Sequence, residues 1–416
     1  MPPDRATADA QELFDRGFQS LEAGDAGEAV ECFTRAIRLR PDVAAGYRYR
    51  AIAYLELGRR TDALNDLDQA IRRKPDDANL YAERARVLLR QKAYDAAIAD
   101  CDKALSLDPG LAPIYGLRGE CHAARGASDN ALEDYARAIA QDPDHTAEYL
   151  LARADLHLDC ERYEACITDC TSAANLAPEN SLVYQTRGMA HRDAGDADAA
   201  DADFTEALRL EPTMVLARLG RATVRLTRKQ FTEAIADCDA LIAQAPTLAK
   251  AYEIRGTARR HLGNPKEAEA DFTEAIRLTP GNPLAYNLRA GLRYIQGEYA
   301  RAIQDHLEAL KRDPQHAPTF NQLGWIWATA PDPDVRNGFR AKECATRACE
   351  LTEWQEPGFL DTLAAAHAEC GAFDDAVKWQ EKAIAILPDD PHDDYHSRLE
   401  LYQSEKPYRT KGAASG

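Results

Sequence analysis

The chain has 416 residues, of which 45% are hydrophobic, 29% are charged and 7% are aromatic, and alanine and leucine dominate the apolar share. The formal net charge of -18 disfavours a nucleic-acid partner, because affinity for a phosphate backbone comes largely from Lys and Arg. No stretch reaches the roughly 18 apolar residues of a membrane span, and the first residues lack the pattern of a secretion signal, so we expect a helical cytoplasmic chain without membrane insertion.

Prolines recur along most of the chain at a nearly constant spacing. Pro41 and Pro75 are 34 residues apart, and the same interval, once lengthened to 35, separates all the prolines of the series. The series consists of Pro41, Pro75, Pro109, Pro143, Pro178, Pro212, Pro246, Pro280 and Pro314. A period of this length is typical of stacked helix-turn-helix repeats. The pattern predicts a mobile tail over residues 1–9 and nine regular repeats over residues 10–316.

Small and large residues also recur at fixed positions when each proline is numbered 32 in its repeat. Position 8 is always Gly or Ala, position 20 is Ala in eight of the nine repeats and Cys166 in the other, and position 4 is often Tyr. Small side chains opposite large ones let two helices pack closely. Gly is frequent at position 15, which suits the turn after a first helix, and the proline ends the second helix.

Residues 184–212 contain the whole pattern in YQTRGMAHRDAGDADAADADFTEALRLEP. Tyr at position 4, a small residue at 8, Gly at 15, Ala at 20, an aromatic residue at 24, Ala at 27 and Pro at 32 together resemble the tetratricopeptide repeat. The resemblance implies an all-α fold, a right-handed superhelical α-solenoid of antiparallel helix pairs (a TPR array). It also implies that the first helix of each repeat lines a concave face that binds a peptide or a partner helix.

A pair of opposite charges repeats together with this pattern. Position 7 is Arg in repeats 1 to 9, and position 23 is Asp in repeats 2 to 9. Pairing each Asp with the Arg of the next repeat would leave Arg16, Arg50 and Asp305 without partners, whereas two other arrangements each leave one Arg unpaired. We expect pairing within a repeat, because the two positions lie equally far from the turn at position 15. Such a bridge should be substantially buried and structural.

Histidines occupy position 11 in three consecutive repeats, as His122, His157 and His191. A column of imidazoles could bind a metal ion, but position 11 normally packs between helices, so we expect a structural role. The ten cysteines match neither a secreted disulfide pattern nor a C-x2-C zinc pair, which predicts reduced, buried thiols. P-loop, zinc-protease and serine-hydrolase motifs are missing from the sequence. We therefore expect no catalytic residues, no metal and no cofactor.

The repeat pattern changes after Pro314. The next matching proline is Pro388, so residues 317–356 are expected to form a degenerate tenth repeat with an inserted loop, and residues 357–390 an eleventh repeat. These two repeats resemble the C-terminal repeats of planctomycete-type bacterial multi-repeat proteins. The resemblance implies a bacterial source.

The last part of the chain is expected to close the array. Residues 391–405 carry Tyr395, Leu399 and Tyr402 at helical spacing, which predicts a capping helix that covers the apolar end of the last repeat. Residues 406–416 are then expected to form a mobile C-terminal tail.

Positions 2, 5, 9, 12 and 13 of the first helices usually meet the ligand in tetratricopeptide arrays, and they define a candidate binding groove. The groove residues are Arg48, Arg86 and Arg90 in repeats 2 and 3, and Asn287, Tyr294, Asn321 and Trp325 in repeats 9 and 10. The first set is a basic patch. In the second set, two amides could bond a ligand backbone, and aromatic rings favour an interface. Alternatively, Trp325 packs against the inserted loop.

The expected function is that of a non-catalytic scaffold or adaptor that binds a peptide or a partner protein on the concave face. The alternative is a structural subunit that self-associates through the ends of the solenoid. We expect a protein ligand, no nucleic acid, and a monomer or weak homo-oligomer. Measuring the oligomeric state distinguishes the two hypotheses.

Overall fold

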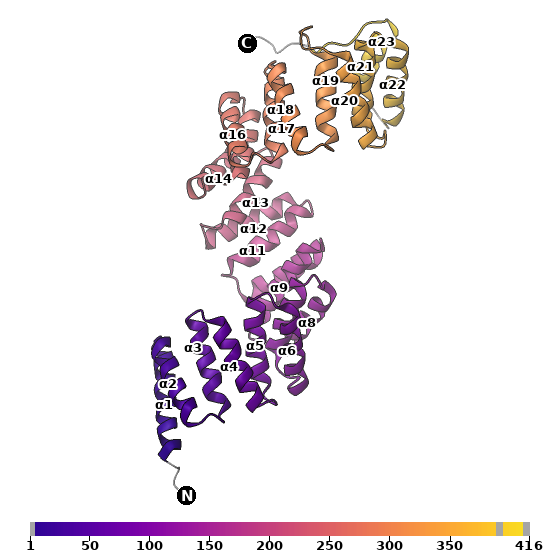
Figure 1. The fold of residues 1–416 in the computed structure, drawn as a ribbon. Helices are drawn as coiled ribbons and strands as arrows, with labels where there is room; N and C mark the ends of the chain where they lie inside the picture. Colours follow the sequence, from indigo (N-terminus) through magenta and orange to yellow (C-terminus); the bar gives the residue numbers. More distant parts are fainter. Residues whose placement is uncertain (1–4, 388–393, 411–416) are drawn as a thin grey trace. The chain divides into compact units, whose positions relative to one another are not determined.

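The computed structural model describes residues 5–387 and 394–410. These residues form 23 helices, and successive helices pack antiparallel in pairs (Figure 1). The chain divides into two compact units, Met1–Met214 with α1 to α12 and Val215–Gly416 with α13 to α23. Within each unit, the predicted all-α solenoid of antiparallel helix pairs is confirmed.

In the first unit, each odd-numbered helix is the first helix of a repeat and the following even-numbered helix is the second. The helices are α1 (Arg5–Glu22), α2 (Ala26–Leu39), α3 (Ala44–Glu56), α4 (Arg60–Arg73), α5 (Ala78–Arg90), α6 (Tyr94–Leu107), α7 (Ala112–Ala124), α8 (Ser128–Gln141), α9 (Thr146–Asp159), α10 (Tyr163–Leu176), α11 (Ser181–Asp193) and α12 (Ala197–Leu210). The first helix of each repeat also packs against the second helix of the repeat before it.

The second unit continues the same order and ends in a single additional helix. The helices are α13 (Val215–Thr227), α14 (Phe231–Gln244), α15 (Ala249–His261), α16 (Pro265–Leu278), α17 (Pro283–Ile295), α18 (Tyr299–Arg312), α19 (Ala317–Thr329), α20 (Gly338–Leu351), α21 (Pro357–Glu369), α22 (Phe373–Ile386) and α23 (Asp394–Gln403). Residues 330–337 between α19 and α20 form the inserted loop of the tenth repeat. α23 packs against α22 and covers the last repeat (Figure 1).

Each regular first helix ends in a turn with a left-handed residue at position 15. In repeat 2 this residue is Gly58, with a φ of 71°, and the N–H of Arg59 donates to the carbonyl of Tyr54 over 2.8 Å. This bond closes the end of α3 and reverses the chain toward α4. Three repeats hold the same conformation without glycine: Lys92, Glu161 and Lys229, with φ of 61°, 58° and 60°.

The two helices of a repeat approach closely where a small residue meets an aromatic ring. In repeat 8, a Cβ atom added to Gly256 would lie 2.7 Å from a ring carbon of Phe272, which is completely buried. The same contact pairs Gly17 with Phe33, Gly119 with Tyr135, and Gly188 with Phe204. At these sites a larger residue at position 8 would force the helices apart, because the interior has no spare volume.

The Arg–Asp pairs lie within repeats, which confirms the prediction from their spacing. Arg153 donates from Nε and Nη2 to the two carboxylate oxygens of Asp169, at 2.7 Å each. The same geometry joins Arg50 to Asp66, Arg84 to Asp100, Arg118 to Asp134, Arg187 to Asp203, Arg221 to Asp237, Arg255 to Asp271 and Arg289 to Asp305. The aspartate side chains are at most 9% exposed, so the pairs are substantially buried.

Some of these arginines also hold the preceding repeat. The Nη1 atom of Arg84 donates to Asp68 in α4 over 2.5 Å. Arg118 and Arg255 form the same bond with Asp102 and Asp239. In Arg50 and Arg289, the Nη1 atom donates instead to a threonine hydroxyl, that of Thr34 and that of Thr273. One guanidinium therefore links three helices, the two of its own repeat and the second helix of the repeat before it.

Position 11 places another basic side chain beside the same aspartates. The Nε2 atoms of His122, His157 and His191 lie 3.8, 3.9 and 3.8 Å from Asp134, Asp169 and Asp203. In the next three repeats, Arg225, Arg259 and Arg293 donate to Asp237, Asp271 and Asp305 over 2.9, 2.8 and 2.7 Å. The histidines thus pack beside buried carboxylates, as expected for a structural role.

The cysteines are all unpaired thiols. Seven of the ten are buried, whereas Cys370 after α21 is exposed. Burial raises the pKa of Cys121 to about 11 and that of Cys238 to about 12, so both stay protonated at neutral pH. Protonated, buried thiols are poor nucleophiles, which fits a packing role for these cysteines.

Within the segment expected to form a capping helix, the structure places α23 at Asp394–Gln403, and this helix brings a new ion pair. Arg398 in α23 donates from Nε to Asp361 in α21 over 2.7 Å, and both side chains are at most 10% exposed. Burial raises the pKa of the Asp361 carboxyl, while Arg398 acts in the opposite direction. Tyr402 in α23 is 1% exposed, so the cap is firmly seated.

The chain ends differ from the expected mobile tails. α1 begins at Arg5, so the helix takes in residues 5–9 as well, and residues 1–4 lie outside the described part of the chain. Residues 406–410, here called the C-terminal strap, pack against α19 and α21 instead of extending away. The strap donates hydrogen bonds to the carbonyls of Ala328 and Thr329 at the end of α19. Residues 388–393 and 411–416 also lie outside the described part.

Candidate protein-binding surfaces

The predicted basic patch in repeats 2 and 3 divides into one paired and two exposed arginines. Arg48 in α3 donates from Nε and Nη2 to one carboxylate oxygen of Glu83 in α5, at 2.8 and 2.5 Å. Arg86 and Arg90 in α5 are exposed to solvent. Two of the three predicted side chains therefore present an open positive charge, while Arg48 holds α3 to α5.

A pocket of about 270 Å³ lies beside the two exposed arginines. Its walls are formed by Ala51, Ile52, Leu55, Leu67, Glu83, Arg86, Val87 and Arg90, from α3, α4 and α5. Glu83 also lines the pocket, but its second oxygen, Oε2, is buried and has no hydrogen-bond partner among the described residues. The pocket therefore combines an apolar floor with two exposed cationic groups.

The amide of Asn287 is engaged inside the protein. Its Oδ1 atom lies 2.9 Å from Nδ1 of His306 and accepts a hydrogen bond from the Thr319 hydroxyl at 3.1 Å. Burial lowers the pKa of His306 to about 4, so the ring is neutral near pH 7. The Oδ1 atom of Asn287, which was expected to bond a ligand backbone, therefore belongs to a hydrogen-bond network between repeats 9 and 10.

Asn321 differs from Asn287 although it occupies the same position in the next repeat. Its side chain is partly buried, and its Oδ1 atom has no hydrogen-bond partner among the described residues. The two asparagine side chains therefore have different surroundings, and they do not present a matched pair of amides to a ligand.

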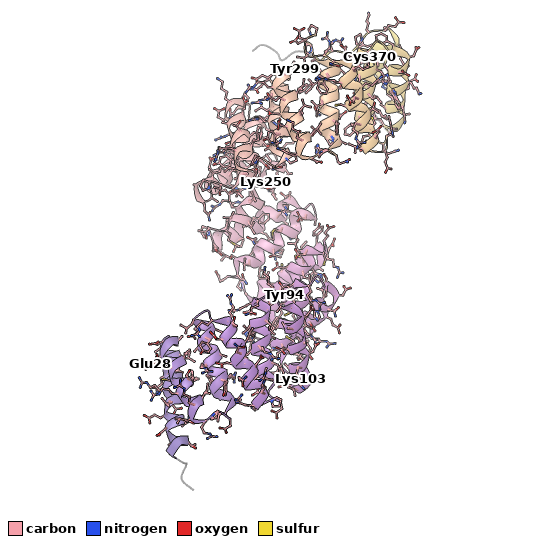
Figure 2. All side chains as sticks on the ribbon, in the orientation of Figure 1. Glu28, Tyr94, Lys103, Lys250, Tyr299 and Cys370 are labelled. Carbon is pink, nitrogen blue, oxygen red and sulfur yellow. The ribbon has the colours of Figure 1, made fainter. Side chains whose placement is uncertain are left out.

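Tyr294 and Trp325, two residues of the candidate groove, lie in contact. The Nε1 atom of Trp325 donates to the Tyr294 hydroxyl over 3.1 Å. The ring of Tyr299, labelled in Figure 2 at the start of α18, packs edge-on against Tyr294. The Trp325 ring also lies 5.7 Å from the Tyr408 ring of the C-terminal strap. These two residues of the predicted groove are thus covered by the chain itself.

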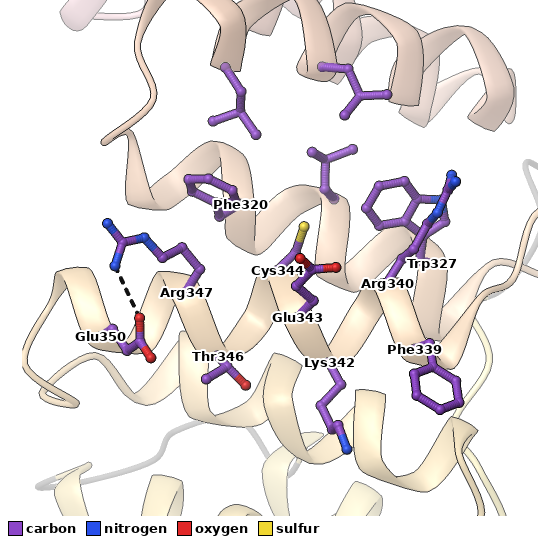
Figure 3. Close-up of a pocket in the computed structure, with 13 residues that line it drawn as sticks. Phe320, Trp327, Phe339, Arg340, Lys342, Glu343, Cys344, Thr346, Arg347 and Glu350 are labelled. Carbon is purple, nitrogen blue, oxygen red and sulfur yellow. Dashed lines mark hydrogen bonds and ion pairs between the residues drawn. The ribbon is translucent and has the colours of Figure 1, made fainter.

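A large apolar groove of about 1000 Å³ lies between α18, α19 and α20 in the second unit (Figure 3). Phe320 and Trp327 line it on α19, and the guanidinium of Arg340 lies 5.6 Å from the Trp327 ring. At the edge of the groove, the Phe339 side chain at the start of α20 is 81% exposed. The ion pair of Arg347 with Glu350, at 3.1 Å, closes the other end.

The sequence analysis missed this groove, although one residue signals it. Phe339 occupies position 18, where the regular repeats carry a small or polar residue such as Thr61 or Asp129. A large apolar side chain at an exposed helical position breaks the repeat pattern, and such exposed apolar surface often marks an interaction site. The inserted loop at 330–337 separates α19 from α20 in sequence at this same place.

Neither a metal site nor a membrane crossing is found in the described part of the chain. No three His, Cys, Asp or Glu side chains among residues 5–387 and 394–410 are grouped so that they could hold a metal ion. Over the same residues, every helix falls short of the length or the apolar character that a bilayer crossing requires.

The sequence profile of the tetratricopeptide repeat family matches residues 20–59, 50–112, 186–249 and 255–317, and a second tetratricopeptide repeat profile matches residues 359–387. The chain belongs to the tetratricopeptide repeat family. The matches include repeats of both units, among them the eleventh repeat at the C-terminal end. No curated protein matches this tetratricopeptide repeat protein at a significant level.

Several solved structures are similar to this tetratricopeptide repeat protein. One chain of the crystal structure of the APC/C hetero-tetramer Cut9-Hcn1 gives a TM-score of 0.49 at 13% identity, with 96% of this chain and 96% of that chain covered. Yeast Tom70 gives a TM-score of 0.43 at 15% identity, with 95% of each chain covered. Pseudomonas aeruginosa pilF gives a TM-score of 0.45 at 21% identity, with 50% of this chain and 94% of that chain covered.

Proposed function

We propose that this tetratricopeptide repeat protein is a non-catalytic scaffold or adaptor that holds a peptide or partner protein on the surface of its first helices. The observation that carries the proposal is the pocket between α3 and α5, where an apolar floor lies beside exposed Arg86 and Arg90. Arrays of this family generally serve protein–protein interaction. We also propose a bacterial protein of the planctomycete type, on the resemblance of its last two repeats, and a cytoplasmic location, which the free, mostly buried thiols support.

The chemistry of this pocket favours an acidic segment of a partner. Guanidinium groups bind carboxylates through paired hydrogen bonds, so Arg86 and Arg90 would hold an Asp or Glu side chain or a free C-terminus. A neighbouring large apolar side chain would fill the floor formed by Ile52, Leu55 and Val87.

The test is a peptide array in which each extended peptide carries one large apolar residue beside Asp or Glu. The tightest peptide is then measured by fluorescence anisotropy against the unmodified chain, Arg86→Glu and Arg90→Glu. We expect each variant to weaken binding about tenfold or more, because a repulsive carboxylate replaces an attractive guanidinium. Arg72→Glu, the same change at an exposed site on the second helix α4, should leave binding unchanged.

Two outcomes would count against this proposal. Peptides that bind equally well to the unmodified chain and to both variants would remove the pocket as the binding site. A stable oligomer in light scattering, dispersed by changes at the ends of the array, would favour the alternative of a self-associating structural subunit. A monomer would leave only the scaffold or adaptor function.

A further inference from the structure

The C-terminal strap lies across the ends of first helices in the second unit. Thr410 donates from its backbone N–H and its hydroxyl to the Thr329 carbonyl at the end of α19, at 2.9 and 3.0 Å. Arg409 donates from Nη1 to the Ala328 carbonyl over 3.3 Å and pairs through Nη2 with Glu369 at the end of α21. The strap is therefore held by main-chain carbonyls and one carboxylate.

These carbonyls are open to the strap because α19 ends without the usual turn. Ala330 follows the helix in an extended conformation, with φ of -51° and ψ of 139°, whereas regular repeats place a left-handed residue after the first helix. The last carbonyls of a helix need donors from outside it, and they carry partial negative charge. An arginine and a hydroxyl group meet both needs at Ala328 and Thr329.

The aromatic residue of the strap fits beside the same helix end. The Tyr408 ring lies 5.7 Å from the Trp325 ring, and the guanidinium of Arg398 lies 5.4 Å from the Tyr408 ring. Tyr294 completes this wall: burial raises the pKa of its hydroxyl, which also bonds with Trp325 and Thr410. The strap seat thus recognises three consecutive residues by three different kinds of contact.

We propose that the strap seat, formed by Tyr294, Trp325, the end of α19 and Glu369, is a peptide-binding site that the chain's own residues 406–410 occupy. A partner protein binds there through an extended segment that carries an aromatic residue, an arginine and a hydroxyl residue in that order. The inference rests on the proposed scaffold function and assigns it a second site and a sequence preference.

Displacement of the strap leaves the rest of the second unit in place. The strap contains no helix and contributes five residues, and most of its polar contacts are made with backbone carbonyls that any extended peptide can reach. The capping helix α23 is held independently by the buried pair of Arg398 with Asp361. The strap is therefore a separable occupant of the seat.

Tethering sets how strongly the strap competes with a partner. A segment joined by a short linker has an effective concentration in the millimolar range. If the free segment binds with a Kd of about 100 μM, a strap at that effective concentration lowers the apparent affinity of a partner about tenfold or more. Releasing the strap should raise the apparent affinity by the same factor.

The experiment uses a fluorescein-labelled peptide with the sequence SEKPYRT, which is residues 404–410 of this chain. Its affinity is measured by anisotropy for the full chain and for full-length Arg409→Glu. The substitution places a carboxylate opposite Glu369 and at the negative end of α19, so it should release the strap. We expect about tenfold tighter binding to the variant. Arg277→Glu on α16, which is 67% exposed, should behave as the unmodified chain.

A second peptide, with Glu in place of its Arg, should not bind the variant measurably. Equal affinity of SEKPYRT for the full chain and for Arg409→Glu, or no binding to the variant at millimolar peptide, would overturn the inference. If circular dichroism shows that Arg409→Glu is unfolded, a chain ending at residue 405 replaces it with the same expectations. The Arg86 measurements concern the first unit, so either site can fail while the other stands.

Discussion

The regular repeats and the C-terminal end meet the same two structural needs with residues at very different separations. A buried ion pair joins Arg153 to Asp169, 16 residues apart, in a regular repeat, and Arg398 to Asp361, 37 residues apart, in the cap. In the regular repeats, a turn within the same repeat closes each first helix. At the C-terminal end, Thr410 donates to the last carbonyl of α19, on Thr329, which is 81 residues earlier in the chain.

The difference shows where such an array can change state. Contacts within one repeat form and break together with the repeat, because stability in a stacked array is a sum of repeats and neighbouring interfaces. A contact supplied by a distant segment can be lost while the repeats stay folded. The regular body is therefore suited to rigidity, and the C-terminal end to exchange of one segment for another.

Breaking one pair in the regular body should give the largest effect. Arg153→Ala leaves the Asp169 carboxylate buried and without its guanidinium, which we expect to destabilise repeat 5 by about 3 kcal/mol. Arg153 is the suitable target because Ala136 in the repeat before offers it no side-chain acceptor, unlike Asp68 for Arg84. Hydrogen exchange of α9 and α10 measures the loss locally.

The matched control replaces both partners of this pair. Arg153→Leu combined with Asp169→Leu removes the two charges together, so no unpaired carboxylate remains, and the loss should stay below about 1 kcal/mol. Similar protection of α9 and α10 in the single and double variants would contradict the view that the pair is a buried structural bridge.

Acid should weaken the junction between repeats 9 and 10 next. The pKa of His306 is lowered to about 4, so the fold favours the neutral ring, although Asp305 acts in the opposite direction and His316 acts with burial. A lowered pKa gives stability that is present above the ordinary value near 6.5 and is lost as the pH falls toward 4. We expect a loss of about 2 kcal/mol between pH 7 and pH 5, measured by urea denaturation.

His306→Phe provides the comparison for this pH effect. The aromatic residue matches position 24 of the regular repeats, such as Phe272, and it cannot take up a proton. The variant should lose most of the difference in stability between pH 7 and pH 5 at the junction. An unchanged pH dependence would assign the effect to other groups.

The Arg–Asp pairs could be predicted because their geometry depends only on short separations that recur. Position 7 and position 23 lie equally far from one turn, so a correct helix pair is enough to bring Arg153 and Asp169 together. Asn287 shows the limit of this reasoning. Its position suggested a ligand contact, but position 24 of the same repeat is His306, where four other repeats carry Phe or Tyr. The histidine ring needs a hydrogen-bond partner, which Asn287 supplies.

The strap could not be predicted from the repeat pattern, because it occurs once and its partners are distant in sequence. KPYRT at residues 406–410 carries a tyrosine and an arginine in a short segment after the cap, which is a weak signal of packing. Its seat lies at the end of α19, where the inserted loop of repeat 10 replaces the left-handed residue of the regular turn. That consequence requires the three-dimensional position of the helix end.

The smallest expected effect concerns the turn that the regular repeats keep and α19 lacks. Lys229 holds a left-handed conformation, with φ of 60°, which costs a side chain roughly 1 kcal/mol and costs glycine little. Lys229→Gly should therefore stabilise the array by up to about 1 kcal/mol in urea denaturation. Lys103→Gly, at an exposed site inside α6 (Figure 2), should destabilise it by about 1 kcal/mol, because glycine disfavours a right-handed helix. If Lys229→Gly raises the stability and Lys103→Gly lowers it, backbone conformation, and not loss of the lysine charge, determines the stability of this turn. A loss of stability in both variants would mean that the turn gains nothing from glycine.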